Sequence, residues 1–127
     1  MKNVVVDTHA LVWFLSRDKR LSNQARAIFH DPQVRLIIPV IVLAEIKHLI
    51  HKQRFAHTLD DVLSTISKDS RCVVYSLDLE VVRQAPVDLD IHDSLIVGTA
   101  LAHPDTIDAV LTRDEAIANS GLITTIW

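Results

Sequence analysis

The stretch DLDIHDSLIVGTALA, residues 88–102, places acidic residues directly before an apolar segment with helical periodicity. In a helix that begins at about His92, one face would carry Asp93, Ile96, Val97, Ala100 and Leu101. Asp93 thus continues an apolar face, where an unpaired carboxylate costs several kcal/mol of desolvation. The simpler interpretation is that Asp90 or Asp93 caps the helix N-terminus. One helix needs only one cap, so capping leaves the second acid unexplained.

The chain has 127 residues, of which 49% are hydrophobic, and this predicts one globular domain over residues 1–127. With only two glycines, it lacks a Gly-rich phosphate loop, which excludes a P-loop or dinucleotide fingerprint. The single cysteine, Cys72, lies in an apolar run and is expected to be a core residue in a reducing compartment. The longest uncharged apolar run, residues 36–44, is far shorter than the ~20 residues that cross a bilayer. These features indicate a cytoplasmic protein with no membrane partner.

The formal net charge of −3 argues at first against a nucleic-acid partner. The position of the charges matters more than their total. If five acids bind a cation, the 13 Lys and Arg residues outnumber the rest of the 16 acids. The remaining surface would then be mildly basic.

Apolar, β-branched runs alternate with amphipathic segments along the chain. Strands are expected at residues 2–6, 34–38, 71–77, 108–112 and 123–127. Helices are expected at residues 8–16, 22–31, 39–52, 58–67, 78–84, 92–102 and 115–119. This alternation predicts an α/β fold with a parallel sheet and helices on both of its faces.

Five acids from distant parts of the chain are expected to converge. Asp7 and Asp114 each follow a strand directly, and ligands bind at the carboxyl ends of parallel strands. Glu45 flanks the apolar face of its helix, where a glutamate is more often an edge residue with its head in water. With Asp90 and Asp93 they would repel one another unless a hard cation such as Mg²⁺ or Mn²⁺ binds. Such a site suits phosphodiester hydrolysis by metal-activated water.

Five segments of the chain carry a resemblance to a known family. They are VVVDTHALVWFL (4–15), IPVIVLAEI (38–46), DLDIHDSLIVGTALA (88–102), AVLTRD (109–114) and ITTIW (123–127). In this order they resemble a PIN domain, in particular the ribonuclease toxins of the VapC type. The resemblance implies a Mg²⁺- or Mn²⁺-dependent endoribonuclease on a three-layer α/β/α sandwich with a central, mainly parallel sheet.

The resemblance also implies roles for individual residues. The metal-binding and catalytic quartet would be Asp7, Glu45, Asp93 and Asp114. Thr112 matches a hydroxyl that often lies beside the quartet, and Asp90 matches a frequent extra acid. The family often has proline after the extra acid and arginine or alanine after the following aspartate, where this chain has Ile91 and Ser94. These departures leave the acids intact and bear on subfamily and substrate.

The implied partners are RNA, a small cognate antitoxin protein and a second copy of the chain in a homodimer. Basic residues of two segments are expected to bind the RNA phosphates. These are Arg17, Lys19, Arg20, Lys47, Lys52 and Arg54.

Other readings of the sequence remain open. A receiver-like domain also has acids at strand ends, but it needs adjacent acids after the first strand, where Thr8 follows Asp7. A DxD phosphatase would need aspartate where His9 stands. A catalytically silent PIN-like scaffold or RNA-binding module is a further alternative. Trp13 and Phe14 are most simply core residues, and His92 is the one histidine expected beside the acids.

Overall fold

The computed structural model describes all residues, 1–127, and contains one five-stranded sheet. All neighbouring strands are parallel, in the order β3-β2-β1-β4-β5. The strands are β1 (Lys2–Val6), β2 (Val34–Pro39), β3 (Cys72–Tyr75), β4 (Ala109–Leu111) and β5 (Thr125–Ile126). Val5 of the central strand lies opposite Ile37 on one side and Val110 on the other. The predicted parallel α/β sheet is therefore confirmed.

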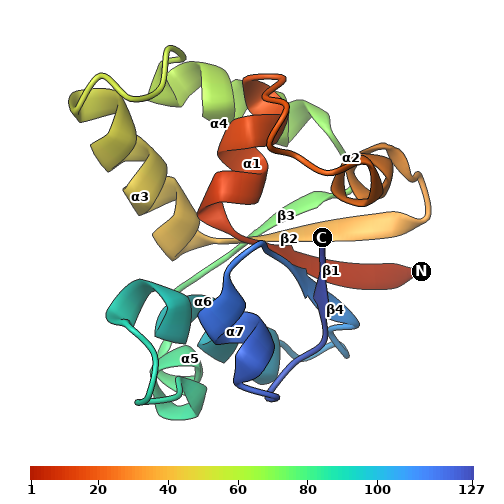
Figure 1. The fold of residues 1–127 in the computed structure, drawn as a ribbon, viewed down its shortest axis with the longest axis vertical. Helices are drawn as coiled ribbons and strands as arrows, with labels where there is room; N and C mark the ends of the chain where they lie inside the picture. Colours follow the sequence, from red (N-terminus) through yellow and green to blue (C-terminus); the bar gives the residue numbers. More distant parts are fainter.

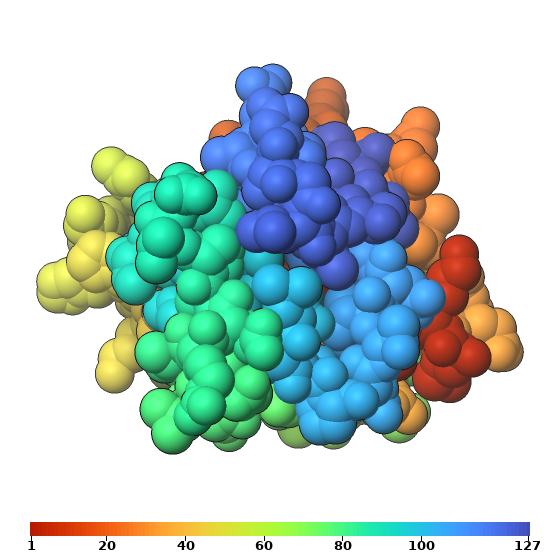
Figure 2. All heavy atoms as spheres, turned by 90° about the horizontal axis from the view of Figure 1, so that it is seen from below, coloured from red at the N-terminus to blue at the C-terminus, as the bar shows by residue number.

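Seven helices cover the two faces of the sheet, which makes a three-layer α/β/α sandwich (Figure 1). On one face lie α1 (Thr8–Leu15), α2 (Asn23–His30), α3 (Val40–His51) and α4 (Leu59–Lys68). On the other lie α5 (Leu79–Gln84), α6 (Ile91–Ala102) and α7 (Glu115–Asn119). Figure 2 shows this second face, which α5, α6 and α7 cover in colours from green to blue. No helix combines the length and apolar character needed to cross a bilayer.

The central strands owe their burial to continuous apolar sequence. Val4, Val5 and Val6 are fully buried, as are Val110 and Leu111 of the neighbouring strand. Strands that are covered on both faces need apolar residues at every position and so lose the alternation of an exposed strand. The two edge strands are shorter than expected, with four residues in β3 and two in β5. Cys72, which was expected to be a core residue, is only half-buried on the β3 edge, and burial raises the pKa of its thiol to about 11.

Helix α6 is buried on more than one side, which the sequence did not predict. Leu101, expected on the apolar face, is 38% exposed, whereas Gly98 is buried against α5. A Cβ atom added at Gly98 would lie 2.6 Å from the carbonyl oxygen of Val81. Glycine thus lets the two helix backbones touch, and this contact fixes the position of the acidic first turn of α6.

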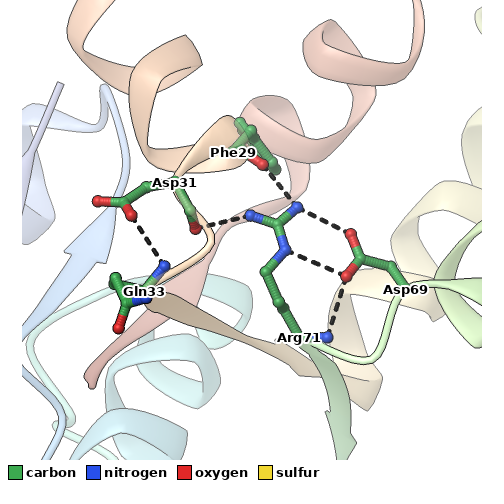
Figure 3. A network of polar contacts seen from close by, with 5 residues as sticks. All are labelled: Phe29, Asp31, Gln33, Asp69 and Arg71. Atoms are coloured by element: carbon green, nitrogen blue, oxygen red, sulfur yellow. Dashed lines mark hydrogen bonds and ion pairs between the residues drawn. The ribbon is translucent and has the colours of Figure 1, made fainter.

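At the amino ends of β2 and β3, a half-buried arginine joins three segments of the chain (Figure 3). The Arg71 guanidinium donates to the carbonyl oxygens of Asp31 at 2.8 Å and Phe29 at 2.7 Å. It also donates to both carboxylate oxygens of Asp69, at 3.1 and 2.8 Å. We call this group the Arg71 clamp. It ties the end of α2 to the start of β3 and donates to two carbonyls at the C-terminal end of that helix.

Candidate metal-binding site

The site begins at the carboxyl end of β1, where Asp7 caps helix α1. Its Oδ1 accepts a hydrogen bond from the backbone N–H of Ala10 at 2.8 Å, and its Oδ2 accepts one from the Thr112 hydroxyl. The Thr112 hydroxyl oxygen also accepts from the backbone N–H of Asp114, at 3.0 Å. Asp7 is only 7% exposed, and this burial raises the pKa of its carboxyl against the opposing effect of the two hydrogen bonds. The ends of β1 and β4 are thereby linked through one carboxylate.

Two more acids of the site are helix N-caps. Asp90 Oδ1 accepts from the backbone N–H groups of His92 and Asp93, at 3.0 and 3.1 Å. Asp114 Oδ1 accepts from the N–H of Ile117 at 3.0 Å and caps α7. The capping interpretation is therefore correct for Asp90. It leaves Asp93, in the first turn of the same helix, without a capping role.

Asp93 is, besides Asp7, an acid of the site whose ionised form is disfavoured. The pKa of its carboxyl is raised to about 7, mainly by burial, and the negative charge of Asp114 and a hydrogen bond with Asp90 contribute in the same direction. Asp93 lies in the first turn of α6, and the Asp90 cap holds this turn by accepting the backbone N–H of Asp93. Asp114 and Asp90 thus both oppose the ionisation of Asp93, whereas hydrogen bonds from backbone N–H groups lower the pKa of Asp90 itself.

Glu45 reaches the site from the middle of helix α3. Its Oε1 accepts a hydrogen bond from the hydroxyl of Thr8, at 2.9 Å, and its Oε2 lies 3.6 Å from Nδ1 of His92. The side chain is 22% exposed, so it does not extend freely into water as an edge glutamate would. Thr8 is buried and follows Asp7 directly, so the start of α1 orients two of the acids.

All five acids line one pocket, a cavity of about 360 Å³. We call it the acid pocket and define it by Asp7, Glu45, Asp90, Asp93 and Asp114. A second cavity of about 300 Å³ shares Thr8, His9, Glu45 and His92 with it and continues along α3. In Figure 1 the connections that leave β1, β2 and β4 meet at this edge of the sheet. The convergence that was expected at the strand ends is therefore present.

The donor set fits a hard divalent cation by its chemistry. Five carboxylates in one cavity supply the oxygen ligands that Mg²⁺ and Mn²⁺ prefer, and the raised pKa values of Asp7 and Asp93 show that their negative charge lacks compensation. In the arrangement described, no three of these side chains converge closely enough to hold an ion. Binding therefore requires rotation of side chains, for which the exposed Asp90 and half-buried Asp93, Asp114 and Glu45 have more freedom than the buried Asp7.

The structure adds pocket residues that the sequence did not single out. Thr8, His9, Trp13 and Arg113 all line the acid pocket. Trp13 is buried, as predicted, but its ring also borders the cavity. The sequence offered one signal for two of them, because Thr8 is adjacent to Asp7 and Arg113 is adjacent to Asp114. His92, the one histidine expected beside the acids, lines the pocket.

The six basic residues expected to bind RNA are all exposed, but none lines the acid pocket. Arg20 contacts a residue that does line the pocket: its guanidinium carbon lies 4.7 Å from the centre of the Trp13 ring. Its charge is shared with Asp18, at 2.8 Å.

Comparisons with known proteins agree on one fold family. The family model described as PIN domain matches residues 4–121. No curated protein matches the sequence significantly. Among solved structures, the chain is similar to one described as VapBC2 from Rickettsia felis bound to a DNA fragment from their promoter. The TM-score is 0.69 at 13% identity, covering 98% of this chain and 97% of the other, a likeness of fold.

Proposed function

The chain belongs to the PIN domain family, and we propose that it is a Mg²⁺- or Mn²⁺-dependent endoribonuclease. The observation that carries this proposal is the acid pocket, where five carboxylates line one cavity at the carboxyl ends of the strands. Asp7 is buried and Asp93 is half-buried, and ionised carboxylates in such positions are costly unless a cation binds. The absence of a Gly-rich loop leaves phosphodiester hydrolysis as the chemistry that best suits these side chains.

In this proposal Asp7, Glu45, Asp93 and Asp114 would hold the ion. When bound, the ion lowers the pKa of a water molecule and neutralises charge on the phosphate. The protein's part is to hold the carboxylates in position. Thr112 and the N–H of Ala10 fix both oxygens of Asp7, and Thr8 fixes one oxygen of Glu45.

Asp90 acts more indirectly, by holding the first turn of α6. Its Oδ1 accepts hydrogen bonds from two backbone N–H groups. The bond from the N–H of Asp93 is the largest of the effects that lower the pKa of Asp90. Asp90 therefore remains ionised while burial favours the protonated form of Asp93. It keeps Asp93 directed into the pocket.

Calorimetry with Mn²⁺ and Mg²⁺ tests the metal site directly. The wild-type protein is expected to bind either ion, and both ions should raise its melting temperature because they bind the native state. Asp93→Asn should lose most of this affinity. Asp88→Asn is the matched control, because Asp88 is exposed and does not line the pocket.

Two results would contradict the proposal. The first is a wild-type protein that binds neither ion at millimolar concentration. The second is cleavage of RNA that persists in excess EDTA. A chain that binds RNA but neither metal would instead be a silent PIN domain, the alternative favoured by the lack of three converged ligands.

The proposal extends to biology: the chain would be the toxin of a toxin–antitoxin pair, held inactive by a small antitoxin. The uncompensated charge of the acid pocket supports this, because a basic side chain of a partner protein would find complementary carboxylates there. Expression without the partner gene should arrest growth, and Asp7→Asn should relieve the arrest. Harmless expression of a protein that still cleaves RNA in vitro would make it a housekeeping nuclease.

A homodimer is also part of the proposal. Apolar side chains are exposed along β3, α5 and the loop that precedes α6: Val73, Val74, Leu79, Val82 and Val87. Burial of such a set against a second copy would remove apolar surface from water. Sedimentation of the wild type and of Val82→Lys would test it, since a lysine on this surface should dissociate the dimer.

A further inference from the structure

Trp13 lies at the border of the acid pocket, and two arginine side chains lie over its ring. The guanidinium carbon of Arg20 is 4.7 Å from the centre of the indole ring, and that of Arg113 is 5.5 Å from it. Both distances fall within the ~6 Å range of cation–π attraction. The rings of His9, at 5.4 Å, and Trp127, at 5.7 Å, complete the surroundings of the indole. Trp13 is therefore held rigidly and can orient what stacks on it.

The two arginines differ in their partners. Arg20 is bound through two side-chain hydrogen bonds to Asp18, at 3.1 and 2.8 Å, so its charge is already neutralised. Arg113 is exposed and makes no hydrogen bond or ion pair with any side chain. It is nevertheless the one Lys or Arg among the residues that line the acid pocket.

This placement is unusual for an arginine beside five carboxylates. Direct pairing with an acid would be the simplest arrangement, yet the guanidinium lies over the indole, with its five N–H donors unused. A phosphodiester that approaches the acid pocket carries negative charge and is repelled by the carboxylates. A planar guanidinium at the entrance offsets that repulsion and matches two phosphate oxygens at once.

We propose that Arg113, positioned by Trp13, binds a phosphate of the RNA at the entrance of the acid pocket. This inference rests on the proposed nuclease function and assigns the residue that brings the substrate to the site. Arg113 is the contact residue, and Trp13 is a positioning residue that acts through it.

The test measures binding of a short fluorescein-labelled single-stranded RNA by anisotropy over a range of salt concentrations. Asp7→Asn provides the background, so that cleavage does not interfere. Arg113→Gln should weaken binding about tenfold and make the slope of log K against log salt shallower by about 0.7, which corresponds to one lost phosphate contact. Arg113→Lys should restore the slope but only part of the affinity, because a lysine keeps the charge and loses the planar fork.

Arg83→Gln is the matched control, since Arg83 is exposed on α5 and does not line the pocket. It should leave both the affinity and the slope unchanged. Trp13→Phe should weaken RNA binding several-fold in the protein that retains Arg113. In the Arg113→Gln background it should have no further effect. Such non-additivity is what a positioning role predicts, whereas a general loss of stability would add to every variant.

An unchanged salt slope in Arg113→Gln, together with tighter binding of Mn²⁺ in the otherwise wild-type protein, would overturn the inference. Arg113 would then serve only as a counter-charge to the acids. The two proposals fail separately. A wild type that never cleaves RNA but shows the Arg113-dependent slope loses the nuclease function and keeps the phosphate contact. A wild type that cleaves RNA while Arg113→Gln retains its KM and slope keeps the function and loses the contact.

Discussion

Two polar clusters lie at opposite ends of the strands, at what we call the two edges of the sheet, and their surroundings shift the pKa values of Asp69 and of Asp7 and Asp93 in opposite directions. In the Arg71 clamp, at the amino ends of β2 and β3, hydrogen bonds from Arg71 lower the pKa of Asp69. In the acid pocket, at the carboxyl ends of β1 and β4, burial raises the pKa values of Asp7 and Asp93. The clamp favours the ionised form of its acid, and the pocket disfavours the ionised form of two of its own.

The difference separates a structural cluster from a functional one. A matched, hydrogen-bonded pair with satisfied carbonyls can persist without any ligand, so the clamp needs no further explanation. Carboxylates whose ionised forms are disfavoured by burial, as in Asp7 and Asp93, lower the stability of the free protein and suggest a bound cation. Variants at the two edges should therefore have opposite effects on stability and activity.

The largest effect is expected on RNA cleavage. Replacing a carboxylate of the proposed quartet by its amide, as in Asp93→Asn, removes an anionic ligand, and we expect at least about a 100-fold loss of kcat/KM. Asp7→Asn, Glu45→Gln and Asp114→Asn should behave alike. Single-turnover cleavage in Mn²⁺ measures the loss, and Asp90→Asn should be milder because Asp90 acts through the helix turn it caps.

Unaltered circular dichroism spectra are needed to attribute these losses to the site. Cleavage at the wild-type rate by Asp93→Asn would remove that residue from the quartet. The Arg71 clamp has no expected role in cleavage. A large loss of kcat/KM in Arg71→Met, measured per folded molecule, would therefore contradict the division into a structural and a functional cluster.

The next effect is on stability and belongs to the clamp. Arg71→Met should lower the free energy of unfolding by about 3 kcal/mol, because it removes the donor of the Phe29 carbonyl, one of the two donors of the Asp31 carbonyl and the cation that pairs with Asp69. Urea denaturation followed by circular dichroism measures this change. Arg83→Met is the matched control: the Arg83–Glu80 pair is 3.5 Å apart with 68% and 49% of the side chains exposed, so its loss should cost under about 0.5 kcal/mol. Equal losses in the two variants would mean that the clamp contributes no more than a surface pair.

The sequence predicted the fold because its signals are local. Every expected strand and helix is present, since continuous apolar runs such as Val4–Val6 and capping residues such as Thr58 and Ser22 mark their limits independently of the rest of the chain. The meeting of the acids also followed from the sequence. Once the sheet is parallel, Asp7 and Asp114 must lie at the same edge.

What the sequence did not predict depends on contacts between distant segments. Gly98 is needed only because α5 lies within touching distance of α6, and nothing near Gly98 in the sequence indicates this. The double role of Trp13 depends on Arg113, a hundred residues away. The link between Thr112 and Asp7 likewise crosses from β4 to β1, although resemblance had placed a hydroxyl near the acids.

The smallest effect is a dependence of stability on pH that has opposite signs at the two edges. The pKa of Asp93 is raised from 3.8 to about 7, so the folded protein binds a proton there more tightly than the unfolded chain does. Stability from this group is fully present below about pH 4 and is lost as the pH rises through about 7. The pKa of Asp69 is lowered, so its contribution is present above about pH 4 and is lost as the pH falls through its folded value.

Melting temperatures measured in EDTA between about pH 4 and pH 8 should therefore separate the two acids. Asp93→Asn should match the wild type near pH 4 and become more stable than it towards pH 8, by about 1 kcal/mol after allowance for the water that still reaches this side chain. Asp69→Asn should be less stable than the wild type throughout this range, because the contribution of Asp69 is lost only below about pH 4. Saturating Mn²⁺ should reverse the order of Asp93→Asn and wild type, because only the wild type gains from the ion. If Asp93→Asn were less stable than the wild type at pH 8 without metal, the carboxylate of Asp93 would be compensated in the free protein, and the contrast between the two edges would not hold.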